Sequence, residues 1–122
     1  MATIYHFKDL ECWKSCRELS KMISNLIKEL PGNEYNLIDN IQRATRSSTR
    51  NIAEGFGRHH HQENIQFCRI SRGSLFEIWD DLITCLEEGY ITKETYDDFE
   101  KQLNKSIGIL NGYLNYLISL KK

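Results

Sequence analysis

The stretch Asn51-Ile-Ala-Glu-Gly-Phe-Gly-Arg58 interrupts a chain whose other long segments have the apolar spacing of helices. Its two glycines, Gly55 and Gly57, close one apolar-periodic segment, and the next begins a few residues later. Glycine suits a helix C-terminus because it enters the left-handed region without a side-chain clash. The stretch therefore predicts a turn between two long helices, and its Glu54 and Arg58 add charges that a turn alone does not require.

Outward from this turn, apolar residues recur every three or four positions, which is typical of amphipathic helices. The predicted helices cover residues 7–30, 34–56, 62–88 and 93–120. Pro31 ends the first because proline cannot continue the hydrogen-bond ladder, Gly89 ends the third, and Thr92 can cap the fourth. Short connections make successive helices antiparallel. We therefore predict an all-α fold, an antiparallel up-down-up-down four-helix bundle, with residues 1–122 as one domain.

The third predicted helix contains Gly73 near its middle, where glycine costs about 1 kcal/mol relative to alanine. The inward face of the second helix is small at its centre, with Ala44 and Ser48. We expect Gly73 to offset its cost by letting these two helices approach closely. On this reasoning, a Gly73 that faced open water would count against the four-helix assignment itself and against the role proposed from it.

Size and composition favour an ordinary globular protein. The 122 residues are enough for one core, and 40% of them are hydrophobic and 27% charged. No apolar run approaches the roughly 20 residues of a membrane span. Residues 1–9 lack the basic-then-apolar layout of a secretory signal. We expect a cytoplasmic protein with no membrane contact.

The net charge of −1 conceals a strong asymmetry along the chain. Residues 40–75 contain six arginines and two glutamates, whereas residues 76–100 contain nine acids and one lysine. The overall charge predicts no attraction to nucleic acid, but the first of these segments allows a local basic face.

Six arginines are the candidate nucleic-acid-binding residues: Arg43, Arg46, Arg50, Arg58, Arg69 and Arg72. The first three, at i, i+3 and i+7, form one stripe on the second predicted helix. A guanidinium can bind two phosphate oxygens, so the stripe predicts phosphate binding. No aromatic residues are interleaved with it, so base stacking has no support. In the alternative interpretation, the arginines pair with acids of the same or another subunit, namely Glu77, Asp80, Asp81, Glu87 and Glu88.

Asn51, Glu54 and Arg72 are predicted at the edge of the buried face near the helix junction. An unpaired buried charge is very costly, so a carboxylate and a guanidinium there would need each other. We interpret the three residues as a structural polar network. No nucleophile-and-base pair lies beside them, so no catalytic residue and no enzymatic activity are predicted.

The cysteines are predicted to be reduced, buried fillers of the core: Cys12, Cys16, Cys68 and Cys85. The histidine run 59–61 is predicted to be a solvated loop. A zinc site built from Cys12, Cys16 and this run is the alternative. The chain has no Glu-x-x-His motif of the kind that di-iron bundles use. We predict no metal and no cofactor.

Five aromatic residues supply more surface than one small bundle hides easily: Tyr5, Trp79, Tyr90, Tyr113 and Tyr116. They widen the apolar arc of the third and fourth predicted helices, which favours burial against another subunit. Ordinary partial exposure is the alternative.

The chain resembles the four-helix-bundle proteins named for 23S ribosomal RNA intervening sequences. The matching residues are Leu10, Trp13, Lys14, Leu30-Pro31, Gln42-Arg43-Ala44, Asn51 to Arg58, Arg72-Gly73-Ser74-Leu75, Glu77 and Gly89-Tyr90-Ile91. The resemblance covers nearly the whole chain. It implies a bacterial cytoplasmic bundle that forms a homopentamer with a central channel. The chain is also similar to accessory proteins of diversity-generating retroelements, which implies a reverse transcriptase or nucleic acid as partner.

The chain departs from the family pattern at Arg46, Ser48, Thr49 and Arg50, where the family usually has small or apolar residues and a proline. The departure adds two positive charges. The resulting hypothesis is a non-enzymatic oligomeric bundle that binds RNA, or a nucleic-acid-handling partner, through its arginines. The alternative is a scaffold whose charged stripes only join subunits.

Overall fold

The computed structural model describes residues 3–120, so the ends of the predicted 1–122 domain lie outside the described residues. The elements in chain order are a 3-10 turn η1 (Phe7–Asp9), α1 (Glu11–Ile27), α2 (Tyr35–Gly57), α3 (His61–Glu87) and α4 (Lys93–Leu120). No strand occurs within residues 3–120. The predicted all-α fold is confirmed.

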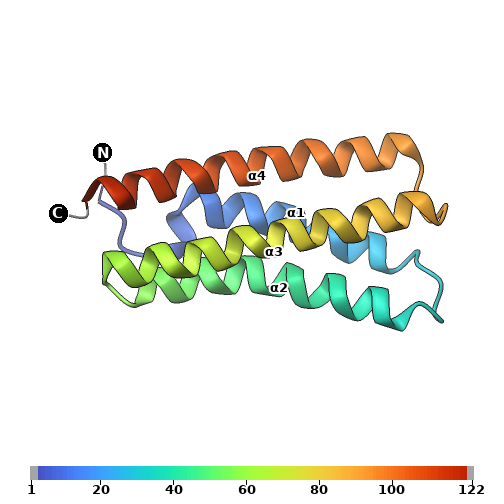
Figure 1. Cartoon of the computed structure of the whole chain (residues 1–122), viewed down its shortest axis with the longest axis horizontal. Coiled ribbons are helices and arrows are strands. Elements are labelled where there is room, and N and C mark those ends of the chain that lie inside the picture. The colour runs from blue at the N-terminus through green and yellow to red at the C-terminus, as the bar shows by residue number, and fades with distance from the viewer. Residues whose placement is uncertain (1–2, 121–122) are drawn as a thin grey trace.

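The four helices lie side by side, and successive helices run in opposite directions along the long axis (Figure 1). α1 packs against α2 and α4, and α3 packs against the same two helices, with the α2–α3 contact the most extensive. Within the described part of the chain, the backbones of the diagonal pairs α1–α3 and α2–α4 stay farther apart, with no two Cα atoms within 8 Å. The molecule is therefore the predicted four-helix bundle.

The first predicted helix is shorter than residues 7–30. Leu10 has an extended backbone (φ −72°, ψ 128°) that separates η1 from α1, while its side chain stays buried. At the other end, the amides of Glu29 and Leu30 bond to carbonyl oxygens three residues back, at 2.9 and 3.2 Å. These bonds tighten the last turn, so α1 ends at Ile27, before Pro31.

The α2–α3 turn does not use its glycines as the sequence suggested. Gly55 and Gly57 are both helical, and His59 is the residue with a left-handed backbone (φ 53°). Gly55 is buried, and a Cβ atom there would lie 2.6 Å from Asn64 Oδ1 and 2.9 Å from Phe67 Cβ. Gly55 is thus required because α2 and α3 approach closely before the turn.

The prediction that Gly73 lets α3 approach α2 closely is wrong. Gly73 is exposed, and a Cβ atom there would meet nothing within 4 Å. Serines instead join the middle of α2 and α3: Ser71 Oγ donates to the Ser48 carbonyl oxygen (2.6 Å), and Ser74 Oγ donates to Ser47 Oγ (2.7 Å). The bundle remains because small side chains and Gly55, rather than Gly73, allow these helices to pack closely.

The α3–α4 turn matches its prediction. Gly89 has a left-handed backbone (φ 78°), and the amide of Tyr90 donates to the Cys85 carbonyl oxygen at 2.8 Å. This pattern satisfies carbonyl groups that the helix end would leave unpaired. Thr92 Oγ1 accepts a hydrogen bond from the amide of Thr95 (3.1 Å), as expected for an N-cap.

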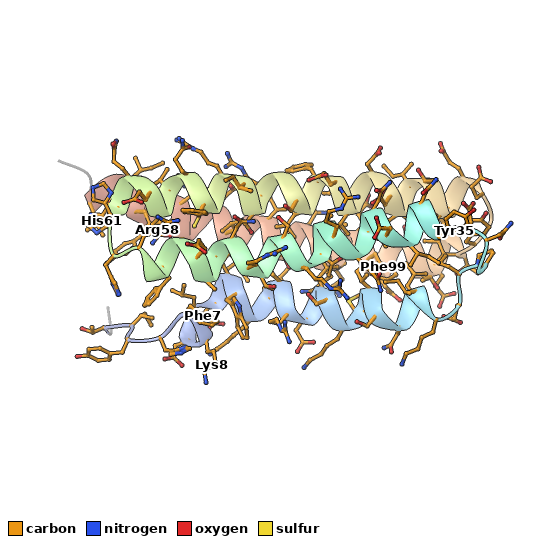
Figure 2. All side chains as sticks on the ribbon, turned by 90° about the horizontal axis from the view of Figure 1, so that it is seen from below. Phe7, Lys8, Tyr35, Arg58, His61 and Phe99 are labelled. Carbon is orange, nitrogen blue, oxygen red and sulfur yellow. The ribbon has the colours of Figure 1, made fainter. Side chains whose placement is uncertain are left out.

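Aliphatic side chains from all four helices fill the core, and the fully buried ones include Leu19, Ile41, Leu75 and Leu103. Figure 2 shows the ring of Phe99 between the helices, whereas Lys8 points away from them. No buried side-chain nitrogen or oxygen within residues 3–120 lacks a hydrogen-bond partner. Over the same residues, no helix combines the length and hydropathy needed to cross a membrane.

Candidate nucleic-acid interface

The six predicted arginines do not form one surface. Arg46 and Arg50 line a groove between α1 and α2, Arg43 lines another between α2 and α3, and Arg58 lies at the turn after α2. Arg72 bonds to α4, and Arg69 lines a separate pocket with Ile118 of that helix. The predicted stripe of Arg43, Arg46 and Arg50 is therefore divided between two grooves of different charge.

The groove between α1 and α2, here called the basic groove, has five cationic side chains: Arg17, Lys21, Lys28, Arg46 and Arg50. Its volume is about 630 Å³, and small polar and aliphatic residues complete its lining: Ser20, Ile23, Ser24, Ile27, Gln42, Thr45 and Thr49. Among the described residues that line it, none is acidic. All charged side chains among the described residues that line the basic groove are therefore positive.

Helical spacing explains how the cations reach this groove. Arg17, Lys21 and Lys28 are separated by four and seven residues, so they lie on one face of α1 and its C-cap. Arg46 and Arg50 are four residues apart on α2, and the packing of these two helices places both sets around one groove. The sequence analysis missed the α1 residues because residues 1–39 are nearly neutral overall, although their spacing was available as a signal.

The charges of the basic groove are uncompensated. Within residues 3–120, none of its five cations has a carboxylate oxygen within 4 Å. The guanidinium of Arg17 lies 5.3 Å from the centroid of the Trp13 ring, a cation–π contact that leaves the positive charge in place. Such a concave cluster of one sign attracts anions and raises their local concentration.

The groove between α2 and α3, here called the acidic groove, has the opposite character. It contains Glu77, Asp80 and Asp81 opposite a single cation, Arg43, and its volume is also about 630 Å³. Arg43 itself donates to Asn40 Oδ1 (2.7 Å) and lies 3.6 Å from Asp39 Oδ2. It therefore does not extend the basic surface.

Asp81 has the most perturbed carboxyl group of the acidic groove. Burial raises the pKa of this carboxyl to about 6, the nearby charges of Asp80 and Glu77 act in the same direction, and Arg43 opposes them. The predicted pairing of the arginines with this acidic stripe is not formed within the described residues, since Arg43 pairs inside its own helix.

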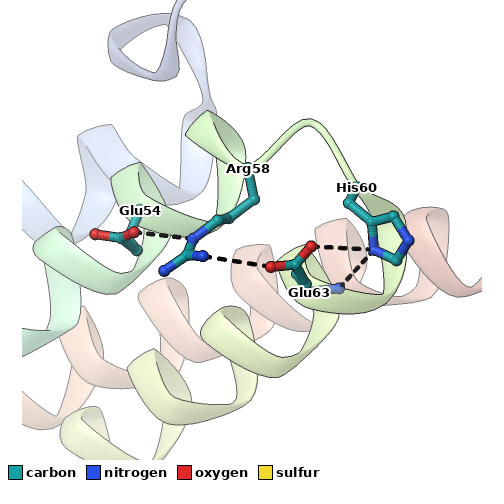
Figure 3. Close-up of polar contacts among 4 residues, drawn as sticks. All are labelled: Glu54, Arg58, His60 and Glu63. Atoms are coloured by element: carbon teal, nitrogen blue, oxygen red, sulfur yellow. Dashed lines mark hydrogen bonds and ion pairs between the residues drawn. The ribbon is translucent and has the colours of Figure 1, made fainter.

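Arg58 is held between two carboxylates. Its Nε lies 3.0 Å from Glu54 Oε2, and its Nη1 lies 3.4 Å from Glu63 Oε1 (Figure 3). His60 Nδ1 lies 3.5 Å from the other oxygen of Glu63, and the Arg58 guanidinium covers the Phe67 ring at 5.1 Å. Arg58 thus links the end of α2 to the start of α3, with its charge compensated.

The predicted network of Asn51, Glu54 and Arg72 does not form. Arg72 Nη1 donates to Asn111 Oδ1 of α4 (2.8 Å), whereas Asn51 Nδ2 donates to the carbonyl oxygen (2.8 Å) and Oγ (2.9 Å) of Ser47. Glu54 pairs with Arg58. Arg72 cannot join Asn51 and Glu54 because it lies on the side of α3 that faces α4, away from α2.

The structure does not assemble the alternative zinc site. Burial raises the pKa of the Cys12 and Cys16 thiols to about 12, which opposes the thiolate form that zinc binds. Cys12 does line the same end cleft as the exposed histidines 59–61. Even so, no three His, Cys, Asp or Glu side chains of residues 3–120 are placed to hold a metal ion.

The aromatic residues that the sequence indicated are exposed only in part. Trp79 and Tyr113 are half-buried, with hydrogen bonds to Tyr96 (2.9 Å) and Asn64 (3.0 Å), respectively. The side chains that α3 presents to solvent are instead Ile70, Phe76 and Ile83, of which Phe76 is 53% exposed. Tyr5 and Tyr116 are exposed as expected, and Tyr90 is half-buried.

The comparisons with known proteins agree with the fold. The model of the 23S rRNA-intervening sequence protein family matches residues 8–112. A crystal structure of a protein of unknown function from the S23 ribosomal protein family of Bacteroides thetaiotaomicron is similar, with a TM-score of 0.76. It is 23% identical over 84% of this chain and 97% of its own, so it supports the fold alone. No curated protein matches significantly. Since the family match spans most of the helical bundle, this chain belongs to the 23S rRNA-intervening sequence protein family.

Proposed function

We propose that this protein is a non-enzymatic RNA-binding bundle that holds the phosphate backbone of RNA in the basic groove. The observation that carries the proposal is the set of five cations around one groove with no carboxylate among its lining residues. Phosphate neutralisation by Lys and Arg supplies most of the sequence-independent affinity of proteins for nucleic acids. Uncompensated cations are available for it, because no internal ion pair must break first.

RNA is the first ligand to test because the family is named for intervening sequences of 23S rRNA. Because the net charge is only −1, the attraction of RNA depends on where the positive charges lie on the surface. An RNA would approach the basic groove and avoid the acidic groove on the other side of α2. A nucleic-acid-handling partner, such as a reverse transcriptase, stays a prediction of the family resemblance.

The test is fluorescence anisotropy with a labelled RNA hairpin across a salt series from about 50 to about 200 mM. The groove variant Arg17→Ala/Arg46→Ala/Arg50→Ala should bind RNA at least about tenfold more weakly. Each phosphate contact that is lost means that fewer condensed counterions are released on binding, and this release drives the association. The matched control is Arg69→Ala/Lys101→Ala/Lys105→Ala, which removes three exposed cations from α3 and α4. Equal losses in both variants, or no binding by the wild type at low salt, would contradict the proposal.

A second candidate is a scaffold that assembles through its charged grooves. It is favoured by the exposure of Phe76 next to the acidic groove and by the opposite charges of the two grooves. The acidic groove of one chain could accept the cations that line the basic groove of another, which is a head-to-tail contact that can close into a ring. The predicted pentamer would be such a ring.

Light scattering separates the two candidates. The scaffold candidate predicts that the Arg17/Arg46/Arg50 variant has a lower mass than the wild type in the absence of RNA. The RNA-binding candidate predicts an unchanged mass and a loss of RNA affinity alone. A variant of the acidic groove, Glu77→Gln/Asp80→Asn, should also lower the mass under the scaffold candidate and leave RNA binding intact under the other.

A further inference from the structure

We infer that the end cleft receives an unpaired base of the RNA whose phosphates lie in the basic groove. This cleft is formed where the start of α1, the α2–α3 turn and the end of α4 meet. The inference rests on the proposed function and specifies its ligand as a strand with at least one unpaired base. Three features carry it: the aromatic lining of the cleft, its acidic rim, and its position beyond the basic groove.

The end cleft exists because α1 stops short of this end of the bundle. The extended backbone of Leu10 delays the start of α1 to Glu11, and Figure 1 shows that α2, α3 and α4 reach farther toward this end. Gly112 lines the cleft on α4, and a Cβ atom there would meet nothing within 4 Å. The volume of the cleft is about 760 Å³, which is typical of sites that enclose a small organic group.

The lining of the end cleft suits the flat face of a base. Phe56, Tyr113 and Tyr116 contribute aromatic rings, and Tyr116 is 39% exposed. Unpaired bases stack on such rings, and every base has a face that can do so. The Tyr113 hydroxyl accepts a hydrogen bond from Asn64 Nδ2 (3.0 Å) and donates to no other group within residues 3–120, so its hydrogen is available to a base. The sequence gave no sign of this surface, because its rings come from two helices far apart in the chain.

The charge of the end cleft favours a base over a phosphate. Its carboxylates belong to the exposed residues Asp9 and Glu11, and Glu11 Oε2 lies 3.3 Å from Lys14 Nζ. Carboxylates repel phosphate, but they accept hydrogen bonds from the amino groups of bases. The exposed histidines 59–61 add ring nitrogens to the same rim. The phosphates of a bound strand therefore stay in the basic groove, and a base enters the cleft.

The end cleft lies along the line of the basic groove. Thr49 lines the groove, and Phe56, seven residues later on the same face of α2, lines the cleft, roughly 10 Å farther along the helix axis. On α1, Trp13 lies one turn before Arg17, and the Arg17 guanidinium covers its ring at 5.3 Å. A cationic groove with aromatic rings beside it is the arrangement that proteins use to bind single strands.

The experiment measures Kd by fluorescence anisotropy for two labelled strands of about ten nucleotides with equal phosphate count. One is oligoadenylate RNA, and the other is an abasic strand that keeps the same sugar–phosphate backbone. The wild type should bind oligoadenylate at least about fivefold more tightly, since stacking on protein side chains requires a base. The slope of log K against log salt should be the same for both strands, because it counts phosphate contacts.

Substitutions in the end cleft should affect only the strand that has bases. Tyr116→Ala should weaken oligoadenylate binding at least about fivefold and leave the abasic strand unchanged, whereas Tyr116→Phe keeps the ring and should retain the affinity. Gly112→Leu fills the cleft and should act like Tyr116→Ala. The matched controls are Gly108→Leu, at an exposed position of α4 with open space around it, and Tyr35→Ala, at the opposite end of the bundle (Figure 2). Neither control should change the affinity for either strand.

Equal affinities of the wild type for the two strands would overturn the inference and leave the proposed function intact. An equal loss for both strands in Tyr116→Ala would also overturn it, as would equal effects of Gly112→Leu and Gly108→Leu. Circular dichroism shows whether each variant is folded, and the comparison of the two strands on the wild type needs no variant. If neither strand binds at about 50 mM salt, the proposed function itself fails.

Discussion

Gly55 on α2 faces Asn64 on α3 so closely that a Cβ atom at position 55 would lie 2.6 Å from Asn64 Oδ1. Gly73, on α3, has no such neighbour, since a Cβ atom there would meet nothing within 4 Å. Both glycines are helical, so the two positions separate the steric role of glycine from its helix propensity.

The first prediction compares alanine at these two positions. Gly55→Ala should destabilise the protein by about 1–3 kcal/mol, because the new methyl group overlaps Asn64 and Phe67. Gly73→Ala should stabilise it by about 1 kcal/mol, because alanine has the higher helix propensity and the site is open. Urea unfolding followed by circular dichroism measures both. A destabilising Gly73→Ala would show that another chain packs on this site.

The second prediction concerns Ser71, which is fully buried and donates to the Ser48 carbonyl oxygen (2.6 Å). Ser71→Ala should cost about 1 kcal/mol because one hydrogen bond is lost. Ser71→Val should cost about 1–3 kcal/mol, because the larger side chain forces α2 and α3 apart. The control is Ser24→Ala, at an exposed position of α1, and its midpoint should equal or slightly exceed that of the wild type, because alanine has the higher helix propensity. If Ser71→Val matched the wild type too, the helices would not be closely packed here.

The third prediction concerns the pH dependence that Asp81 contributes. Its folded pKa is raised to about 6, mainly by burial, so the folded state binds this proton more tightly than the unfolded state does. Its contribution to stability therefore falls as pH rises from about 4 through about 6 and stays low above that. Asp81→Asn should be more stable than the wild type at pH 7.5, with a smaller difference at pH 4.

Unfolding midpoints at both pH values test this directly. Asp98→Asn, at an exposed position of α4, is the matched control for the removal of one carboxylate. An Asp81→Asn variant that gained nothing at pH 7.5 would mean that Arg43 compensates the carboxylate fully.

The fourth prediction concerns the thiols. Burial raises the pKa of Cys12, Cys16 and Cys68 to about 12 and that of Cys85 to about 11, so all four stay protonated and shielded near neutral pH. Iodoacetamide at pH 8 should therefore leave the native protein unmodified, because the thiolate is the reacting form. In denaturant it should add four labels, as counted by mass spectrometry. Rapid labelling of Cys12 in the native state would show that the end cleft opens.

The helices were largely predictable because helix formation is local. The apolar spacing of α2, α3 and α4 gave bounds within one residue of those observed. Gly89 and Thr92 ended and capped their helices as expected, because left-handed backbone and side-chain capping depend on adjacent residues. The break at Leu10 carried no such signal, since leucine has no special backbone preference and its extended conformation serves the burial of its side chain.

The candidate site was predictable only in part. Arg46 and Arg50 were identified from their spacing, but the sequence analysis grouped them with Arg43, because three residues within two turns share one broad face of an isolated helix. In the bundle that face is divided between two grooves, and Arg43 lies on the acidic side. The remaining cations come from α1, a separate segment.

The amino-acid sequence by itself determined the number of helices, their order, the position of most turns and the family, because these depend on local spacing and on short motifs. Only the tertiary structure decided that Arg17 shares a groove with Arg46, that Arg72 bonds to α4 and that Gly55 rather than Gly73 is crowded. These relationships depend on the rotation of each helix about its axis. Packing of all four helices sets that rotation together, so no single segment encodes it.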